Sequence, residues 1–335
     1  MIVLGIETSC DDTSLALFSP ERGVIEVLTA NQLVHEKYGG VVPEIASRQH
    51  LKTLLPVFAE LLARDKVDEH AIDGIGVSNG PGLLGSLLVG VGFAKALAMA
   101  LQIPIVGVHH IEAHILANEL QLEELRYPCL VLVVSGGHTC LYRVDCAGRY
   151  TLLGTTRDDA AGEAFDKIAK LLGLGFPGGP AVEEAAKPGN KDAVHFPRAM
   201  LGKNEFDFSF SGLKTAVRLY IESRNSLDQQ TIADIAASAQ EAIVDVLVQK
   251  TIACAKKHKI AHAYLAGGVA ANGSLRKCLK THCEKEGMTY HAPLIQYCTD
   301  NAAMVACAAA KQLSCGRNDG LDLDVFARGP VTSWA

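Results

Sequence analysis

The chain has 335 residues, 49% of them hydrophobic, and a formal net charge of −6 at pH 7. This length allows two domains of ordinary size or one large α/β unit. The negative charge excludes a global attraction to nucleic acid, so any RNA contact must come from a local basic face. Ten cysteines without a C-x-x-C pair are typical of reduced thiols in a cytosolic protein and do not indicate a disulfide framework.

The opening of the chain predicts neither a signal peptide nor a membrane anchor. No charged segment precedes the first apolar run, and Glu7 interrupts that run. The longest uncharged stretch, residues 74–94, contains Asn79, Pro81 and several glycines, which predict a strand, a loop and a buried helix rather than a membrane span. We therefore expect a cytoplasmic protein that has no membrane partner.

The first part of the chain predicts alternating strands and helices. Apolar runs separated by a polar turn indicate strands at 1–7 and 14–18, with a third strand at 24–32. Helical periodicity follows over 44–64, where Pro43 is a helix-starting residue. A strand at 72–78, a glycine-rich loop at 79–85, a buried helix up to residue 100 and a strand at 104–108 then lead into a histidine-bearing helix.

The opening pattern recurs about 128 residues later. Strands are predicted at 129–135 and 139–144, joined by the turn Gly136-Gly137-His138. Helices at 162–172, 211–223 and 228–257 follow, then a strand at 261–266, a glycine-rich turn and two further helices. The repeat indicates a duplicated architecture. We expect a first lobe over 1–127, which includes the histidine helix, and a second lobe over 128–335, with its last helix (about 298–313) a candidate for docking back on the first lobe.

The histidines suggest a metal site. On a helix, His110 and His114 share one face, and a distant carboxylate such as Asp300 would complete a facial set that suits iron or zinc. Glu112 lies about 200° round the helix from His110, so the general base of a zinc protease is missing. Spacing alone leaves open that these are ordinary histidines at a helix start.

Three turns carry small residues where a strand ends, at 8–13, 135–138 and 267–273. Backbone N–H groups of such turns can hold phosphate oxygens. The arrangement resembles the actin-like ATPase and sugar-kinase fold, which implies two lobes with a central cleft. One of Asp11 and Asp12 in the first turn holds a metal or a water or orients a nucleophile, or each only bonds its own backbone. We place Asp166 on the exposed side of its helix, and we expect a tight turn at 177–180.

With these residues assembled, the chain resembles the TsaD family, the bacterial branch of the universal tRNA threonylcarbamoyladenosine synthases. The matching stretches span nearly the whole chain in family order: 5–13, 38–48, 79–82, 109–114, 135–139, 176–180, 208–215, 267–272 and 299–301. Two departures are visible. Cys140 stands where a glutamine is common, and Glu183 stands where some relatives carry aspartate, which puts one ribose contact in doubt.

The resemblance implies a cytosolic enzyme that transfers a threonylcarbamoyl group from threonylcarbamoyl-AMP to N6 of the adenosine after the anticodon in certain tRNAs. It also implies a divalent metal on His110, His114 and Asp300, with Fe²⁺ favoured and Zn²⁺ the alternative. The partners that it implies are tRNA, a TsaB-like subunit and a TsaE-like ATPase. The residues implied as adenylate contacts are Val133, Val134, Ser135, Gly136, Gly137, Asp166, Gly179 and Asn272, with Glu183 as a further candidate.

Two further assignments are hypotheses that rest on chemical reasoning. Asp11 is placed to receive or relay the proton of the attacking amine. Lys214 and Arg218 are either phosphate contacts or simply exposed helix charges. The apolar segments at 46–62 and 83–101 form either a partner interface or a core, and the sequence leaves both open.

Three rival functions remain at this point. An actin-like phosphotransferase of small molecules would explain the turns but not the histidine pair with Asp300. A metalloprotease fails on the position of Glu112. A catalytically silent nucleotide-binding scaffold would tolerate alanine at His110 and Asp300. The transferase accounts for all of these features together.

Overall fold

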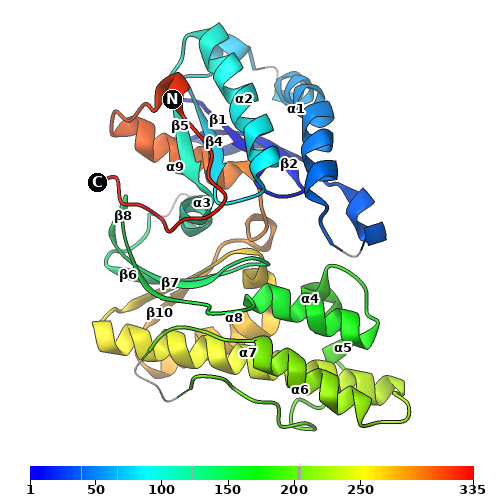
Figure 1. The fold of residues 1–335 in the computed structure, drawn as a ribbon. Helices are drawn as coiled ribbons and strands as arrows, with labels where there is room; N and C mark the ends of the chain where they lie inside the picture. Colours follow the sequence, from blue (N-terminus) through cyan, green and yellow to red (C-terminus); the bar gives the residue numbers. More distant parts are fainter. Residues whose placement is uncertain (39, 66, 122–123, 202–204) are drawn as a thin grey trace. The chain divides into compact units, whose positions relative to one another are not determined.

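A computed structural model describes residues 1–38, 40–65, 67–121, 124–201 and 205–335 (Figure 1). Gly39, which belongs to the matching stretch at 38–48, lies outside the described residues. The chain forms two compact units, one of Met1–Leu125 with Pro293–Ala335 and one of Arg126–Ala292. Residues 293–335, which include the last helix, thus belong to the first unit. We expected them in a second lobe over 128–335, with only the last helix a candidate for docking on the first lobe.

The sheet of the first unit has the strand order β3-β2-β1-β4-β5. The central strand β1 pairs antiparallel with β2 and parallel with β4, while β3 extends the antiparallel side and β5 the parallel side. All five residues of β1 are buried. The bounds are β1 Val3–Glu7, β2 Thr13–Ser19, β3 Gly23–Ala30, β4 Gly74–Gly80 and β5 Ile105–His109.

Helices cover both faces of this sheet. Leu4 and Ile6 on β1 join a core with α1 and α2, whereas the intervening Gly5 faces α9, because side chains alternate along a strand. A Cβ on Gly5 would overlap the backbone of Ala302, so this glycine lets α9 pack closely. The helices of the unit are α1 Pro43–Asp65, α2 Leu84–Leu101, α3 His110–Leu116 and α9 Ala302–Ser314, with short 3₁₀ turns η1 Leu33–Tyr38, η2 Glu69–Ala71, η3 Ala117–Glu119, η5 Ile295–Tyr297 and η6 Gly320–Asp322.

Helix α2 differs from the buried helix that we predicted. Only one of its faces is buried, and Leu88 and Met99 are 56% and 58% exposed. By length and composition α2 is apolar enough to cross a membrane, a test that core helices also pass. Its inner residues Val91, Ala94 and Ala98 pack in the core of the first unit. The uniformly apolar sequence therefore gave no sign of which face would be exposed.

The second unit repeats the sheet of the first. Its order is β10-β9-β6-β7-β8, and β6 pairs antiparallel with β7 and parallel with β9, as β1 does with β2 and β4. The predicted duplication is confirmed, although strands β8 and β10 were not predicted. The bounds are β6 Cys129–Val134, β7 Thr139–Cys146, β8 Arg149–Thr155, β9 His262–Ala266 and β10 Thr289–His291.

The helices of the second unit include one that we predicted as a turn. Residues 177–180 begin helix α5, with Pro177 in extended conformation as its N-cap residue. The N–H of Gly178 donates to Oδ1 of Asp166 at 2.7 Å, which replaces the side-chain cap that proline lacks. The helices are α4 Ala161–Leu172, α5 Gly178–Ala186, α6 Ser211–Glu222, α7 Gln229–His258 and α8 Gly273–Lys285, with the 3₁₀ turn η4 Gly268–Ala271.

Candidate metal centre and nucleotide-binding turns

Helix α3 starts at the end of strand β5, and this junction fixes the two histidines. His109 is the N-cap residue: its Nδ1 accepts the N–H of Ile111 at 3.2 Å, and its Nε2 donates to the carbonyl of Gly329 at 3.2 Å. Burial lowers the pKa of His109 to about 4, so the ring is neutral, as this bonding requires. His110 and His114 follow one turn apart, both buried, with ring centroids 4.6 Å apart.

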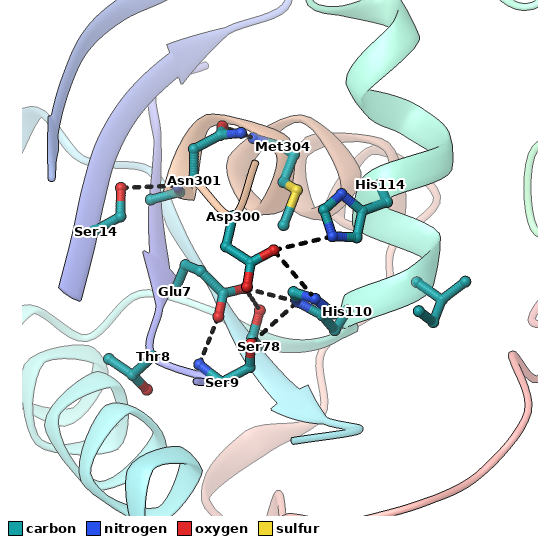
Figure 2. Close-up of polar contacts among 12 residues, drawn as sticks. Glu7, Thr8, Ser9, Ser14, Ser78, His110, His114, Asp300, Asn301 and Met304 are labelled. Atoms are coloured by element: carbon teal, nitrogen blue, oxygen red, sulfur yellow. Dashed lines mark hydrogen bonds and ion pairs between the residues drawn. The ribbon is translucent and has the colours of Figure 1, made fainter. Parts of the chain in front are cut away.

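Asp300, just ahead of α9, completes the group (Figure 2). Its Oδ1 lies 3.1 Å from Nε2 of His114 and 3.5 Å from Nε2 of His110. Ligand atoms of all three residues lie within 4.8 Å of one another, so the group could hold a metal ion. Two imidazoles and one carboxylate form a facial donor set that leaves coordination positions open. The residues therefore fit a divalent ion, as the sequence predicted.

The electrostatics of this cluster favour a positive charge. Burial alone would lower the pKa of His110, but the carboxylates of Asp300 and Glu7 raise it to about 9. Burial alone would raise the pKa of Glu7, and His110 holds it below its ordinary value. A divalent cation beside Asp300 would replace only the proton on Nε2 of His110, while Nδ1 stays bonded to Glu7.

Glu7 is the residue of this cluster that sequence reasoning missed. It is 1% exposed at the end of β1, and its Oε2 lies 3.1 Å from Nδ1 of His110. In the sequence, Glu7 is a charged residue that ends an apolar strand and belongs to the matching stretch at 5–13, but we used its charge only as evidence against a signal peptide. Nothing in the local sequence connects it to a residue 103 positions away.

Glu112 points away from the metal cluster, as the helical spacing predicted. Its Oε2 accepts a hydrogen bond from Nε2 of Gln312 at 3.0 Å, and its Oε1 accepts one from Nε1 of Trp334 at 2.6 Å. These bonds hold the carboxylate in the packing between α3, α9 and the C-terminal segment. The structure thus gives no support to a protease base at this position.

The turn after β1 is held by a buried histidine. Nε2 of His50 must donate to the carbonyl of Cys10, 3.0 Å away, so its Nδ1 accepts the hydroxyl of Thr13 at 2.7 Å. Burial and the nearby Asp11 raise the pKa of Cys10, so its thiol stays protonated and is a packing residue rather than a nucleophile. Asp11 itself is half-buried.

A polar cavity of about 540 Å³ lies beside Asp300 in the first unit. Asp12 lines it and accepts a hydrogen bond from Nδ2 of Asn31 at 2.8 Å. Burial and the neighbouring Asp11 raise the pKa of Asp12 to about 6. The other walls come from strand β3 and from residues 296–301. A substrate group that reaches the metal ligands could occupy this space.

In the second unit, the turn after β6 presents bare backbone. The N–H of Ser135 donates to the carbonyl of His138 at 2.8 Å, which closes the turn. Gly136 and Gly137 have no positive φ and no described atom within 4 Å of an added Cβ. Neither strain nor packing therefore requires glycine at these two positions. A ligand that approaches the backbone closely would require it. Val133 and Val134 are fully buried within β6, so they support this turn from below.

The other residues implied as adenylate contacts stabilise helix starts. Asp166 is half-buried rather than on an exposed side, and burial raises its pKa. Glu183 on α5 accepts the N–H of Gly273 at 2.8 Å, and Asn272 caps α8 through Leu275 while it donates to Gln240. Gly179, like Gly136, has open space where a side chain would be.

Helix α6 carries Lys214, which is half-buried, and Arg218, which lies 3.7 Å from Glu222 one turn on. Asp158 holds the start of this helix, a role that the sequence did not reveal. It accepts the hydroxyls of Ser209 and Ser211 and the N–H of Phe210 at 2.5, 2.9 and 2.7 Å. Burial alone would raise the pKa of Asp158, but these hydrogen bonds together lower it below its ordinary value.

Comparisons with known proteins agree with this arrangement. A solved structure, component A of the (R)-2-hydroxyglutaryl-CoA dehydratase from Acidaminococcus fermentans, aligns with 94% of this chain and 99% of its own, with a TM-score of 0.56 and 14% identity. That likeness supports the actin-like ATPase and sugar-kinase fold class and nothing beyond it.

Sequence relatives reach further. A protein of Fervidobacterium nodosum is 47% identical over 97% of both chains, and one of Ralstonia pickettii is 49% identical over 93% of this chain and 92% of its own; both are named tRNA N6-adenosine threonylcarbamoyltransferase. The family model of the same description, TsaD, matches residues 23–307. This chain belongs to the TsaD family of tRNA N6-adenosine threonylcarbamoyltransferases.

Proposed function

We propose that this chain transfers the threonylcarbamoyl group of threonylcarbamoyl-AMP to N6 of adenosine 37, 3′ of the anticodon, in tRNAs that read codons beginning with A. The product is threonylcarbamoyladenosine, t6A. Family membership over nearly the full length carries the activity. The buried cluster of His110, His114 and Asp300 is the structural observation that favours a transferase over a phosphotransferase or a protease.

The donor is an acyl phosphate and is already activated, so the reaction needs no protein nucleophile. The adenine nitrogen forms a bond to the carbamoyl carbon, the bond from that carbon to the phosphate oxygen breaks, and AMP leaves with the electron pair. An exocyclic amine is a weak nucleophile, so alignment must supply much of the rate. When bound at His110, His114 and Asp300, a divalent ion supplies positive charge for the donor oxygens.

We assign the proton of the amine to Asp11, which lies in the turn held by His50. The carboxylate of Asp11 is half-buried and can take a proton from a substrate that enters beside it. Replacement by asparagine keeps the shape and removes the base. If Asp11→Asn transferred normally at full donor occupancy, Asp11 would not be the acceptor.

The second unit binds the adenylate part of the donor in this proposal. Gly136, Gly137 and Gly179 offer backbone on which phosphate and ribose can lie closely, and Ser135 closes the turn beside the first two. Asp166 and Glu183 each have a second carboxylate oxygen for ribose hydroxyls, and Asn272 has a second amide hydrogen. Val133 and Val134 are buried in strand β6 and position the turn that follows it.

The remaining components follow from the same family membership. The ion is Fe²⁺ in this proposal, with Zn²⁺ as the alternative that the donor set also accepts. A TsaB-like subunit and a TsaE-like ATPase are its protein partners, Lys214 contacts phosphate, and the reaction takes place in the cytoplasm without a membrane. The target base lies in a single-stranded loop, where turning it out costs little.

Single-turnover transfer tests the function. The purified chain, its TsaB-like partner, preformed labelled threonylcarbamoyl-AMP and an unmodified ANN-decoding tRNA are mixed, and the reaction is repeated with His110→Ala. We expect label on the tRNA only with intact metal ligands. A tRNA-independent phosphate transfer would instead indicate a small-molecule phosphotransferase, and equal transfer by both proteins would contradict the role of the metal site.

A further inference from the structure

Glu7 is a buried carboxylate whose surroundings fix its chemistry. It ends the fully buried strand β1 and is 1% exposed. A charge in such a place is costly unless hydrogen-bond donors surround it. The backbone N–H of Ser9 lies 2.5 Å from Oε1, and the Ser78 hydroxyl lies 2.5 Å from Oε2. Both groups donate to Glu7, so they stabilise the ionised carboxylate, which accepts both hydrogen bonds.

The third donor is the ring of His110. Its Nδ1 lies 3.1 Å from Oε2 of Glu7, and Oγ of Ser9 lies 3.2 Å from the same nitrogen. An ionised carboxylate can only accept, so Nδ1 must carry the hydrogen. A neutral imidazole then has its lone pair on Nε2, and that nitrogen is 3.5 Å from Oδ1 of Asp300 (Figure 2).

We propose that Glu7 is a positioning residue for the metal centre: it fixes the tautomer and the ring orientation of His110, so that Nε2 faces the ion. This inference rests on the metal site of the proposed function. The second histidine provides an internal contrast, because Nδ1 of His114 has no hydrogen-bond partner among the described residues. His110 is therefore the ligand that the protein holds in advance, since outer carboxylates of this kind orient the histidines that bind metals.

The variant Glu7→Gln tests the role without a large change in shape. An amide has one acceptor and one donor group. With its NH₂ in place of Oε1 it would oppose the backbone N–H of Ser9, which cannot accept a hydrogen bond. With its NH₂ in place of Oε2 it faces both Ser78, whose hydroxyl can accept, and Nδ1 of His110, so this orientation is favoured. An amide NH₂ opposite Nδ1 of His110 favours the tautomer with hydrogen on Nε2. Nε2 then has no lone pair with which to bind the metal. We expect the affinity for Co²⁺, read from the visible absorption of the bound ion, to fall about 10- to 100-fold.

Glu119→Gln is the matched control. Glu119 is also buried in the first unit, at 5% exposure, and it pairs with Lys311 at 2.7 Å rather than with a metal ligand. We expect this variant to lose unfolding free energy but to keep the wild-type affinity for Co²⁺. If Glu7→Gln bound Co²⁺ as tightly as the wild type, the positioning role would be overturned while the metal site stood. If the wild type bound no Co²⁺, the metal site would fail as well.

A measurement on the unaltered chain keeps the proposal testable if Glu7→Gln does not fold. Nitrogen-15 NMR of the histidine rings in the Zn²⁺-loaded protein distinguishes a protonated Nδ1 from a protonated Nε2. We expect His110 to carry hydrogen on Nδ1 and to bind the ion through Nε2. Coordination through Nδ1 would contradict the role of Glu7 directly.

Discussion

The connection after β1 and the connection after β6 occupy the same place in two sheets of the same strand order, yet they are built from different chemistry. At the end of β1 and just after it, the side chains of Glu7, Thr8 and Ser9 are buried and polar, at 1%, 0% and 3% exposure. After β6, Gly136 and Gly137 are exposed and have no side chain at all. In the proposed function, the same strand arrangement therefore carries a side-chain site for the ion in the first unit and a backbone site for the adenylate in the second.

This difference follows from what each ligand requires. A metal ion needs side-chain donors at fixed positions, and these need further residues to orient them, so its site must be buried and crowded. A phosphate or ribose needs N–H groups and room to approach, which glycine provides. The duplicated frame thus supplies two equivalent strand ends, and the residues that follow each strand decide which chemistry it serves.

The largest effect should come from breaking the side-chain site alone. His114→Ala removes a proposed metal ligand, whose Nε2 lies 3.1 Å from Oδ1 of Asp300. We expect single-turnover transfer to fall at least about 100-fold, because no other described side chain replaces the donor. Equilibrium binding of a non-reactive adenylate should stay within about threefold of the wild type, since the bare turns belong to the other unit. Equal loss of both properties would show that the two sites are not separable.

The converse change fills the proposed adenylate site in the second unit alone. Gly136→Val places a branched side chain where no described atom lies within 4 Å. We expect adenylate affinity to fall about 10-fold or more and unfolding free energy to change by less than about 1 kcal/mol. Calorimetric titration and urea unfolding measure these two quantities. Gly92→Ala, at another open glycine in α2, is the control and should leave adenylate affinity unchanged.

The sequence was sufficient for the parts of this comparison that local patterns encode. The strands that line each turn, the helical spacing of His110 and His114, and the duplication were all readable. The pairing of Glu7 with Ser78 and His110 was not, because these residues are 71 and 103 positions away. Asp158, which holds the start of α6 from more than 50 positions away, was missed for the same reason.

The elements that the sequence missed have weak local signals. Strand β10 has three residues, and β8 mixes exposed and buried positions without alternation. The start of α5 contains two prolines and two glycines, which predict a turn, and its stability depends on Asp166 in a different helix. In each case a tertiary contact outweighed the local preference.

The glycine pair at the start of α5 separates packing from ligand approach in one short segment. A Cβ on Gly178 would overlap the backbone of Asp166, whereas one on Gly179 would meet no described atom. We expect Gly178→Ala to lower the unfolding free energy by about 1–3 kcal/mol. Gly179→Ala should stay within about 0.5 kcal/mol of the wild type and weaken adenylate binding. Equal stability of both variants would contradict the close packing of α4 and α5.

The smallest effect concerns the support of the turn after β1. His50 is fully buried, and burial lowers its pKa below the ordinary 6.5. The unfolded chain therefore takes up this proton more readily, so the stability that neutral His50 contributes is complete above about pH 6.5. It declines as the pH falls toward the lowered pKa. We expect His50→Gln to cost about 1 kcal/mol above pH 7, through imperfect bonds to Cys10 and Thr13.

That difference between wild type and His50→Gln should shrink as the pH falls from 7 to 5, because protonation of His50 then destabilises only the wild type. Urea unfolding at a series of pH values measures it. His70→Gln, at an exposed position, controls for the loss of one histidine. A difference that grew on acidification would mean that His50 is charged in the folded protein. The turn that carries Asp11 would then rest on an ion pair rather than on the neutral ring, unlike the turn after β6, which closes through its own backbone.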